Sequence, residues 1–300
     1  MPTSTAGPEH SKPGMRWCYI LCVNTLGVLL VACSSGQYTG SRYSQAQDSA
    51  PYQAVDVSTV RDAVPRVEPK SRYGNPSSYV VLGKRYDTLA SSKNYKERGI
   101  ASWYGTKFHG HRTSSGEPYD MYRMSAAHKT LPLPTYARVS NLRNGRSVIV
   151  KINDRGPFHE NRIIDLSYAA AARLGVLGKG TGLVEVEAID PLTYTANRPV
   201  RSVPASRPKT AHRATTTSNQ AQPSLYLQLG AFNNRGNAER LRARLSTTEL
   251  PGELRITETV SDQKHIFRLR VGPLANVETA DRLTRILTDQ GIGSPQVVID

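Results

Sequence analysis

The stretch Arg146-Ser-Val-Ile-Val-Lys-Ile-Asn-Asp-Arg-Gly-Pro157 joins a β-branched run to a turn, with an acidic residue at the junction. Branched aliphatic residues favour a strand, and Gly156-Pro157 marks a turn directly after it. A strand that ends at Asp154 can deliver a carboxyl group into a cleft. The same carboxyl group could instead pair with Arg155 or cap the turn.

Around this strand, residues 99–190 are typical of a small, mainly β domain. Leu183 to Ile189 alternates apolar and acidic residues, which predicts a strand with one solvated face. One helix is expected over Tyr168 to Leu174, because Ser167 is a good N-cap and Gly175 fits the position after the C-cap. Many short strands with close-set turns favour a closed barrel over a sandwich.

The same segment contains Glu117, His128 and Asp154, three residue types that transfer protons. Two alternatives stay open at this point. Glu117 could be a solvated loop acid, and His128 could be a structural histidine that orients a carboxyl group. We assign Asp165 to structure, because it lies next to the predicted helix start and can cap that helix or face its positive end.

Other chemistries find little support in the sequence. His109 and His111 have no nearby cysteines and so lack the spacing of a zinc site. A hydrolase triad of Ser115, His128 and Asp154 would lack the Gly-x-Ser-x-Gly elbow, and no phosphate-binding loop is present. We therefore predict neither a metal nor a cofactor.

Composition separates two compact segments, 99–190 and 225–300, from two polar stretches. Residues 33–98 lack a sustained apolar period and predict a flexible tether, and residues 191–224 predict a disordered linker rich in Pro and Thr. The net charge is +15, but residues 225–300 carry ten basic against nine acidic residues. A positive charge concentrated outside this domain suits loose association with an anionic polymer or a membrane surface but supplies no base-reading helix, so cell-wall polymers and anionic lipid are as plausible as DNA.

The N-terminal region predicts export. Lys12 and Arg16 precede the apolar run Trp17 to Ala32, which is short for a membrane span but long enough for a signal peptide. The run ends in Leu-Val-Ala-Cys33, which resembles a bacterial lipobox. This resemblance implies a signal peptide over residues 1–32, a lipid on Cys33, and a mature chain with no second cysteine for a disulfide. The true start could be Met1 or Met15.

The last segment contains an internal repeat with a shift of 42 residues, which superposes Leu227 on Leu269 and Gly230 on Gly272. Each half reads as a strand followed by a helix, with Asn234 or Asn276 near the helix start. With further strands at 254–259 and 296–299, the order is β-α-β-β-α-β, a ferredoxin-like sheet with helices on one face.

Strand alternation indicates what the open face of that sheet displays. Leu225, Leu227, Leu229, Phe267, Leu269 and Val271 are expected to face the helices. The other face then carries aromatic, amide and guanidinium groups, which suit a sugar polymer: Tyr226, Gln228, Phe232, Arg268 and Arg270. An alternative is that the two arginines only solvate an open sheet.

Several motifs of the first domain resemble one family. They are Gly99-Ile-Ala-Ser-Trp-Tyr-Gly105, Thr113-Ser-Ser-Gly-Glu117, Ala126-Ala-His128, Val150-Lys-Ile-Asn-Asp-Arg-Gly-Pro-Phe158 and Arg162-Ile-Ile-Asp-Leu-Ser167. In this order they resemble the rare lipoprotein A family of septal-ring lytic transglycosylases, with small departures at Ser114 and Leu133-Pro134. The resemblance implies a six-stranded double-psi β-barrel, with Asp154 as the catalytic acid/base and Glu117 and His128 as the other essential site residues.

The last segment similarly resembles the SPOR domain, in Tyr226-Leu-Gln-Leu-Gly-Ala-Phe232 and Phe267-Arg-Leu-Arg-Val-Gly-Pro273. That family binds septal glycan strands that lack stem peptides. The two resemblances imply a lipid-anchored enzyme of the periplasm that cleaves peptidoglycan glycans, with divisome proteins as possible partners. A non-catalytic glycan-binding lipoprotein is the alternative. An RNA-binding protein shares the β-α-β-β-α-β order, but the near-neutral domain charge and the predicted export oppose it.

Overall fold

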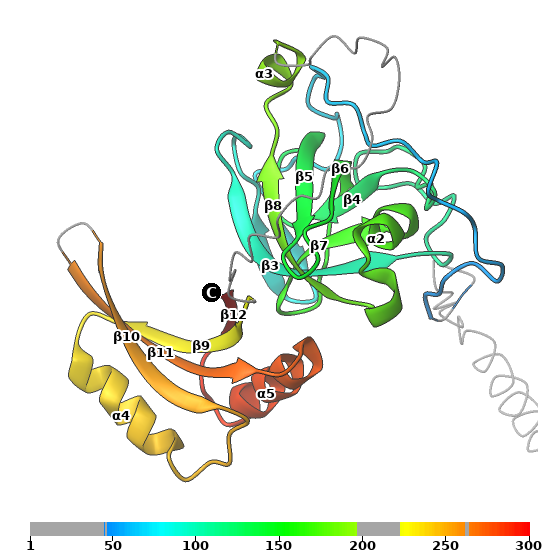
Figure 1. Ribbon diagram of the computed structural model, residues 1–300. Coiled ribbons are helices and arrows are strands. Elements are labelled where there is room, and N and C mark those ends of the chain that lie inside the picture. The colour runs from blue at the N-terminus through cyan, green and yellow to red at the C-terminus, as the bar shows by residue number, and fades with distance from the viewer. Residues whose placement is uncertain (1–44, 46, 197–222, 262–263) are drawn as a thin grey trace, which may run out of the picture. The chain divides into compact units, whose positions relative to one another are not determined.

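The first domain is a closed barrel of six strands in a computed structural model that describes residues 45, 47–196, 223–261 and 264–300 (Figure 1). The strands follow each other around the barrel in the order β3-β7-β4-β6-β5-β8, with parallel pairs β3–β7 and β4–β6 and antiparallel pairs elsewhere. Their bounds are β3 Lys96–Tyr104, β4 Ser125–His128, β5 Thr135–Asn141, β6 Ser147–Asp154, β7 Arg162–Ser167 and β8 Gly182–Ala188. The predicted six-stranded barrel is confirmed.

Alternate residues of these strands fill the barrel. Val150 and Ile152 of β6 are fully buried with Ile164 and Leu166 of β7, while the residues between them face outward. The predicted helix is α2 (Tyr168–Leu174), in which Ser167 accepts a hydrogen bond from the Ala170 backbone and Gly175 is left-handed. Three alanines of α2, Ala169, Ala170 and Ala171, are fully buried, because small side chains let the helix lie close against the barrel. A 3₁₀ turn, η1 (Leu177–Lys179), follows the helix.

The stretch before the barrel differs from the prediction. We expected a flexible tether as far as residue 98, but residues 47–95, which we call the strap, are attached to the barrel (Figure 1). The strap includes the hairpin of β1 (Ser78–Val81) and β2 (Lys84–Asp87), whose turn residues Leu82 and Gly83 both have positive φ. Scattered apolar residues such as Val57 and Tyr86 are buried, but many contacts of the strap are polar, so its sequence shows no apolar period.

These polar contacts occur along the whole strap. Asp48 accepts hydrogen bonds from the Gly105 and Lys107 backbones at 2.7 and 3.0 Å. A Cβ on Gly105 would lie 2.2 Å from the Ser49 carbonyl oxygen, so only glycine permits this close approach. Further along, the Asn75 amide exchanges two hydrogen bonds with the Leu133 backbone, each 2.8 Å long. The strap is therefore part of the first domain.

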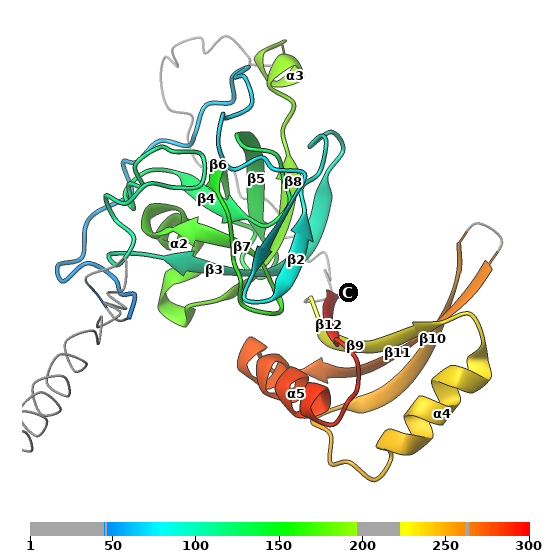
Figure 2. The same ribbon diagram turned by 180° about the vertical axis from the view of Figure 1, so that it is seen from behind.

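The second described domain is a four-stranded antiparallel sheet in the order β10-β11-β9-β12, with helices α4 and α5 on one face (Figure 2). The bounds are β9 Leu225–Phe232, α4 Arg235–Leu245, β10 Glu253–Ser261, β11 Lys264–Leu274, α5 Val277–Asp289 and β12 Gln296–Ile299. The β-α-β-β-α-β order is confirmed. The side chains of Asn234 and Asn276 cap the two helices, as the repeat predicted.

The predicted linker over residues 191–224 also differs at its ends. Pro191–Ala196 forms the short helix α3, and Ser224 exchanges two backbone hydrogen bonds with Asp300. The predicted signal peptide over residues 1–32, the predicted lipidation site Cys33 and residues 197–222 lie outside the described residues. Among the residues that are described, no helix is long and apolar enough to cross a membrane.

Candidate active site

Asp154 lies at the end of β6, where a register shift against β4 turns its side chain outward. Ile152 pairs with Ala126 and Asp154 with Ala127, so Asn153 is an extra residue in the ladder. Without this extra residue, Asp154 would follow Val150 and Ile152 into the barrel interior. The shift places the carboxyl group on the outer face of the barrel, on the same side as Ala127.

One oxygen of this carboxyl group is fully occupied. Oδ1 accepts hydrogen bonds from the Ser114 backbone N–H at 2.8 Å, the Ser114 hydroxyl at 2.7 Å and the Arg155 backbone N–H at 2.7 Å. Within the described part of the chain, no hydrogen bond reaches Oδ2. Burial raises the pKa of Asp154, and the bonds from Ser114 and Arg155 offset only part of this effect, so the pKa stays above its ordinary value. A proton can therefore reside on Oδ2 and be exchanged there.

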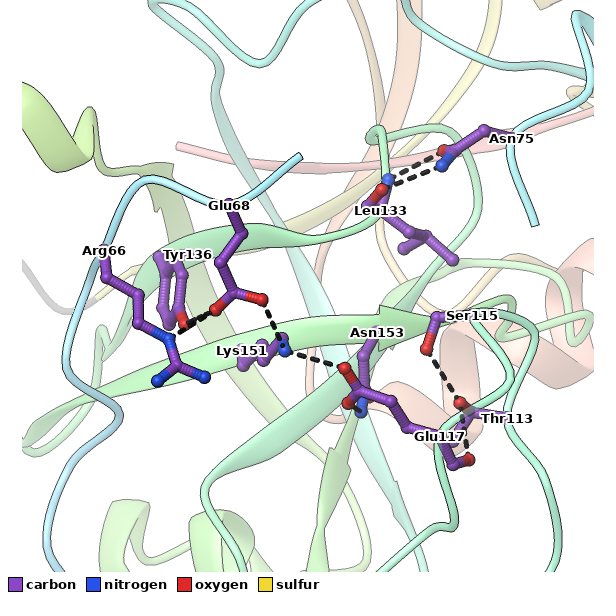
Figure 3. A network of polar contacts seen from close by, with 10 residues as sticks. All are labelled: Arg66, Glu68, Asn75, Thr113, Ser115, Glu117, Leu133, Tyr136, Lys151 and Asn153. Atoms are coloured by element: carbon purple, nitrogen blue, oxygen red, sulfur yellow. Dashed lines mark hydrogen bonds and ion pairs between the residues drawn. The ribbon is translucent and has the colours of Figure 1, made fainter. Parts of the chain in front are cut away.

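Glu117 lies on a turn that is attached to the same end of β6. Its side chain accepts hydrogen bonds from Lys151 Nζ and Asn153 Nδ2, both at 2.8 Å (Figure 3). Burial alone would raise the pKa of Glu117, but these two bonds outweigh it and the pKa falls below its ordinary value. Glu117 is thus held ionised. Its side chain is exposed, but these two bonds distinguish it from the alternative of a merely solvated loop acid.

The two carboxyl groups are linked through consecutive residues of one strand. Asn153 bonds Glu117, while the next residue, Asp154, bonds Ser114 on the same 113–117 turn. The Ser115 N–H also donates to the Asn153 carbonyl at 3.2 Å. The two environments shift the pKa values of Asp154 and Glu117 in opposite directions, which is how a site obtains one proton donor and one carboxylate.

His128 is not brought into contact with either carboxyl group. Its Nδ1 accepts from the Thr130 and Leu131 backbones at 3.2 and 3.0 Å, so the proton belongs on Nε2, which donates to the Tyr95 hydroxyl at 2.8 Å. Tyr95 in turn donates to Glu97. Burial, with a smaller contribution from Arg155, lowers the pKa of His128 to about 3, so the imidazole is neutral.

The role open to His128 is to shape the turn beside Asp154. The carbonyl oxygens of His128 and Leu131 accept hydrogen bonds from Arg155 Nη1 at 3.2 and 2.5 Å. Arg155 Nε donates to the Gly74 carbonyl of the strap at 2.8 Å. The imidazole therefore fixes the backbone that holds Arg155, whose own N–H bonds Asp154. This arrangement matches the alternative of a structural histidine that orients a carboxyl group.

Asp165 does not cap helix α2, which corrects the capping role predicted for it. The helix N-cap is Ser167, whereas the Asp165 carboxyl accepts a hydrogen bond from the Ser102 hydroxyl on the neighbouring strand. Asp165 pairs with Ala127, which on its other side pairs with Asp154. Burial raises the pKa of Asp165 despite the bond from Ser102. In the sequence, Asp165 lies beside the start of the helix. In the structure, strand β7 continues past Asp165 to Ser167, and the Asp165 side chain contacts Ser102 of the neighbouring strand.

A cavity of about 700 Å³ lies next to Glu117. One wall comes from the strap and the other from the 117–125 loop and strands β5 and β6, and Lys151 and Asn153 also line it. Lys151 Nζ joins the two walls, since it bonds Glu117 at 2.8 Å and Glu68 of the strap at 3.0 Å (Figure 3). Sequence reasoning missed both Lys151 and Glu68. Lys151 could have been found, because its position between the buried Val150 and Ile152 predicts an outward side chain on the strand that ends at Asp154.

The open face of the second domain carries four of the five predicted residues. Arg270 pairs with Gln228 and Arg268 with Ala231, on the side opposite the buried Leu227 and Leu269. Tyr226 lies on the same open face by alternation. Arg255, which pairs with Arg270, adds a further guanidinium that the sequence reasoning did not single out.

Phe232 is wrongly placed by simple alternation. A register shift leaves Leu229 as an extra residue, so Gly230 pairs with Leu269 and Phe232 with Phe267. Phe232 packs against the core on the helix side, and its ring would contact a Cβ added to Gly230. The described residues contain no group of three or more His, Cys, Asp or Glu side chains placed to hold a metal ion.

Comparison with known proteins matches both domains. Residues 96–186 match the double-psi β-barrel family described as lytic transglycolase, and residues 221–299 match the SPOR domain. In an alignment 321 residues long, the chain is 40% identical to the endolytic peptidoglycan transglycosylase RlpA of Pseudomonas aeruginosa strain UCBPP-PA14. The alignment covers 90% of this chain and 93% of the relative. The chain belongs to the RlpA family.

Other RlpA proteins agree with this assignment. The RlpA of Vibrio cholerae serotype O1 is 40% identical over 274 residues, which cover 91% of each chain. The crystal structure of the RlpA SPOR domain from Pseudomonas aeruginosa is 34% identical and covers 25% of this chain and 96% of that one, with a TM-score of 0.24. The two family matches and the two RlpA relatives confirm the resemblance inferred from the motifs, at the level of the RlpA family and of its two domains.

Proposed function

We propose that this RlpA-family protein is a lytic transglycosylase that cleaves the bond between N-acetylmuramic acid and N-acetylglucosamine in peptidoglycan. The relatives named above are endolytic peptidoglycan transglycosylases, and the chain spans more than nine-tenths of their length. The products carry 1,6-anhydro ends, and strands without stem peptides are preferred. Asp154 is the residue that acts on the glycosidic bond.

The reaction needs one group that first gives and then takes a proton. Asp154 Oδ2–H donates its proton to the glycosidic oxygen while the bond from that oxygen to the anomeric carbon breaks. The positive charge that develops on the sugar is oxocarbenium-like, and the ionised Glu117 carboxylate stabilises it. The 6-hydroxyl oxygen of the same sugar then forms a bond to the anomeric carbon, and its proton returns to Asp154.

The observation that carries this proposal is the carboxyl group of Asp154, which has a raised pKa and one oxygen that accepts no hydrogen bond from the described residues. The variant Asp154→Asn keeps the shape of the side chain but cannot exchange the proton. It should release no anhydro sugars from stripped peptidoglycan, as measured by mass spectrometry, while it still pellets with glycan. Asp87→Asn, on the exposed hairpin, is the matched control and should retain activity.

Two results would contradict the mechanism. Cleavage by Asp154→Asn at the wild-type rate would remove Asp154 from the reaction. Reducing ends in place of anhydro ends would make the protein a hydrolase, in which water rather than the 6-hydroxyl attacks. Binding of glycan by the wild-type protein without any cleavage would favour the alternative of a non-catalytic glycan-binding lipoprotein.

We further propose that a lipid on Cys33 anchors the protein in the cell envelope, facing the periplasm. The lipobox-like Leu-Val-Ala-Cys33 supports the anchor, and the serine that follows favours the outer membrane. Cys33→Ser should leave an unprocessed precursor, and a fatty-acid analogue should label only the wild-type protein. Label on the variant would show that Cys33 is not the site.

The SPOR domain supports enrichment at division septa, where divisome proteins are candidate partners. We propose that Tyr226, Gln228, Arg268 and Arg270 of its open face contact stripped glycan strands. The aromatic ring can stack on a sugar ring, and the amide and guanidinium groups can bond hydroxyl and acetamido oxygens. Phe232 is not part of this surface, since it packs on the helix side.

A further inference from the structure

The strap supplies a cationic wall to the cavity beside Glu117. Arg61 and Arg66 of the strap line this cavity, and Arg123 and Lys151 line it from the barrel side. Two carboxylates, Glu117 and Asp120, line it with them. The cavity therefore contains more cations than anions, and two of the cations come from a segment that lies outside the matched barrel family, which begins at residue 96.

The backbone around Arg61 is held in place, whereas its exposed side chain has no partner among the described residues. The Val60 carbonyl accepts a hydrogen bond from Arg173, and Asp62 pairs with the same guanidinium at 3.2 Å. The Ala63 N–H donates to the Ile149 carbonyl at 2.9 Å. Backbone and side-chain contacts thus fix both neighbours of Arg61, while no hydrogen bond or ion pair involves the Arg61 side chain anywhere in the described ranges.

Arg66 is fixed in a different way. Its Nε donates to Glu68 at 2.7 Å, and Glu68 also accepts from Tyr136 at 2.5 Å and Lys151 at 3.0 Å (Figure 3). Burial alone would raise the pKa of Glu68, but the bonds from Tyr136, Arg66 and Lys151 lower it to about 2. Glu68 therefore stays ionised and holds the guanidinium of Arg66 at the cavity while Arg61 remains unpaired.

An arginine that lines a cavity without a partner among the described residues is suited to a carboxylate ligand, which its guanidinium can bind through two parallel hydrogen bonds. A glycan of the proposed substrate class carries one such group. The lactyl ether of N-acetylmuramic acid ends in a carboxyl group that is an amide while the stem peptide is attached, and a free carboxylate once the peptide is removed. Only the stripped strand thus offers an anion at the lactyl position itself, because the carboxylates of an attached stem peptide lie further from the sugar ring.

We propose that Arg61, with Arg66 beside it, forms a subsite for the lactyl carboxylate of a stripped glycan strand. This inference rests on the proposed function. It assigns the preference for stripped strands to the catalytic domain as well as to the SPOR domain. An amide at the same position offers no negative charge to the guanidinium, and a stem peptide adds bulk at the cationic wall.

The test compares two substrates and two charge reversals in the protein from residue 34 onward. The substrates are glycan oligomers with free lactyl carboxylates and the same oligomers after amidation of these groups with methylamine. The wild-type protein should cleave the free form with a kcat/KM about tenfold higher, the low end for one charge-assisted hydrogen bond. Arg61→Glu should remove this difference, because a carboxylate then faces the substrate carboxylate.

Arg143→Glu is the matched control. Arg143 is exposed, has no side-chain partner among the described residues, and lies in the turn before β6, at the opposite end of that strand from Asp154. This variant should keep the wild-type ratio. Equal cleavage of both substrates by the wild-type protein, or an unchanged ratio in Arg61→Glu, would overturn the inference.

A binding measurement separates this inference from the proposed reaction. In the Asp154→Asn background, fluorescently labelled oligomers with free carboxylates should bind more tightly than amidated ones, and addition of Arg61→Glu should abolish the difference. Discrimination in binding with no cleavage by the wild-type protein would refute the reaction but support the subsite. Cleavage by the wild-type protein with no discrimination in either assay would support the reaction and refute the subsite.

Discussion

Ser114→Ala provides a direct test of how the pKa of Asp154 is set. Ser114 donates two hydrogen bonds to Asp154 Oδ1, from its backbone at 2.8 Å and from its hydroxyl at 2.7 Å. Alanine removes the hydroxyl and leaves the backbone bond. Because both bonds favour the ionised carboxylate, the variant should have a higher Asp154 pKa than the wild-type protein.

The size of the shift follows from the bond that is lost. Removal of a hydrogen bond to a charged group costs about 1.5 to 3 kcal/mol. The lower end applies, because Oδ1 keeps two backbone donors, and about 1.4 kcal/mol corresponds to one pKa unit. The proton donor is the form present below the pKa, so the alkaline limb of kcat/KM should move upward by about one pH unit.

The assay is the pH dependence of kcat/KM for release of anhydro products, from about pH 4 to about pH 9. Ser115→Ala is the control, since the Ser115 hydroxyl bonds Thr113 at 3.0 Å and does not contact Asp154. The control should leave the alkaline limb where it is. An unmoved or lowered limb in Ser114→Ala would refute Asp154 as the acid or the hydroxyl as a determinant of its pKa.

Three further predictions concern the strap, the histidine and the SPOR domain. The pKa of Glu68 is lowered to about 2, so the contacts of its ionised carboxylate stabilise the attached strap fully above pH 4.5, the ordinary pKa of the group, and are lost as the pH falls toward 2. Limited proteolysis should therefore show the strap released in acid. In Glu68→Gln, the strap should be released already at neutral pH. The pKa of His128 is about 3, so its imidazole NMR signals should not titrate between about pH 5 and about pH 8, and a midpoint in that range would contradict its neutral role. Deletion of residues 225–300 should disperse the protein from division sites but leave its cleavage of stripped glycan intact. In the full-length protein, Arg268→Ala should weaken pelleting with stripped glycan, whereas Glu239→Ala on α4 should not. Equal pelleting of the two variants would exclude the open face as the glycan-binding surface.

Local sequence signals predicted the regular elements well. The β-branched run before Asp154 and the alternation after Gly182 identify two barrel strands, because each has a buried and a solvated side. Ser167 and Gly175 locate α2 through its caps, which depend only on neighbouring residues. The repeat likewise predicted both halves of the C-terminal domain.

The features that sequence reasoning missed depend on contacts between distant residues or on irregular ladders. The pair of Glu68 with Lys151 joins residues 83 positions apart, and a polar strap shows no period that would reveal such a pair. Phe232 was assigned to the wrong face because one extra residue at Leu229 reverses the alternation. The same kind of shift beside Asn153 turns Asp154 outward, and alternation along β6 alone would have placed its side chain inside the barrel.

The attached strap sets how far the enzyme could work from a lipid on Cys33. A free chain from Cys33 to residue 99 has 66 residues and could span at most roughly 230 Å. Because Asp48 is already bonded to the barrel at Gly105, only 15 residues remain, which reach about 50 Å at full extension. A lipidated protein would then act only on the layer of cell wall nearest its own membrane, and release of the strap would lengthen its working radius several-fold.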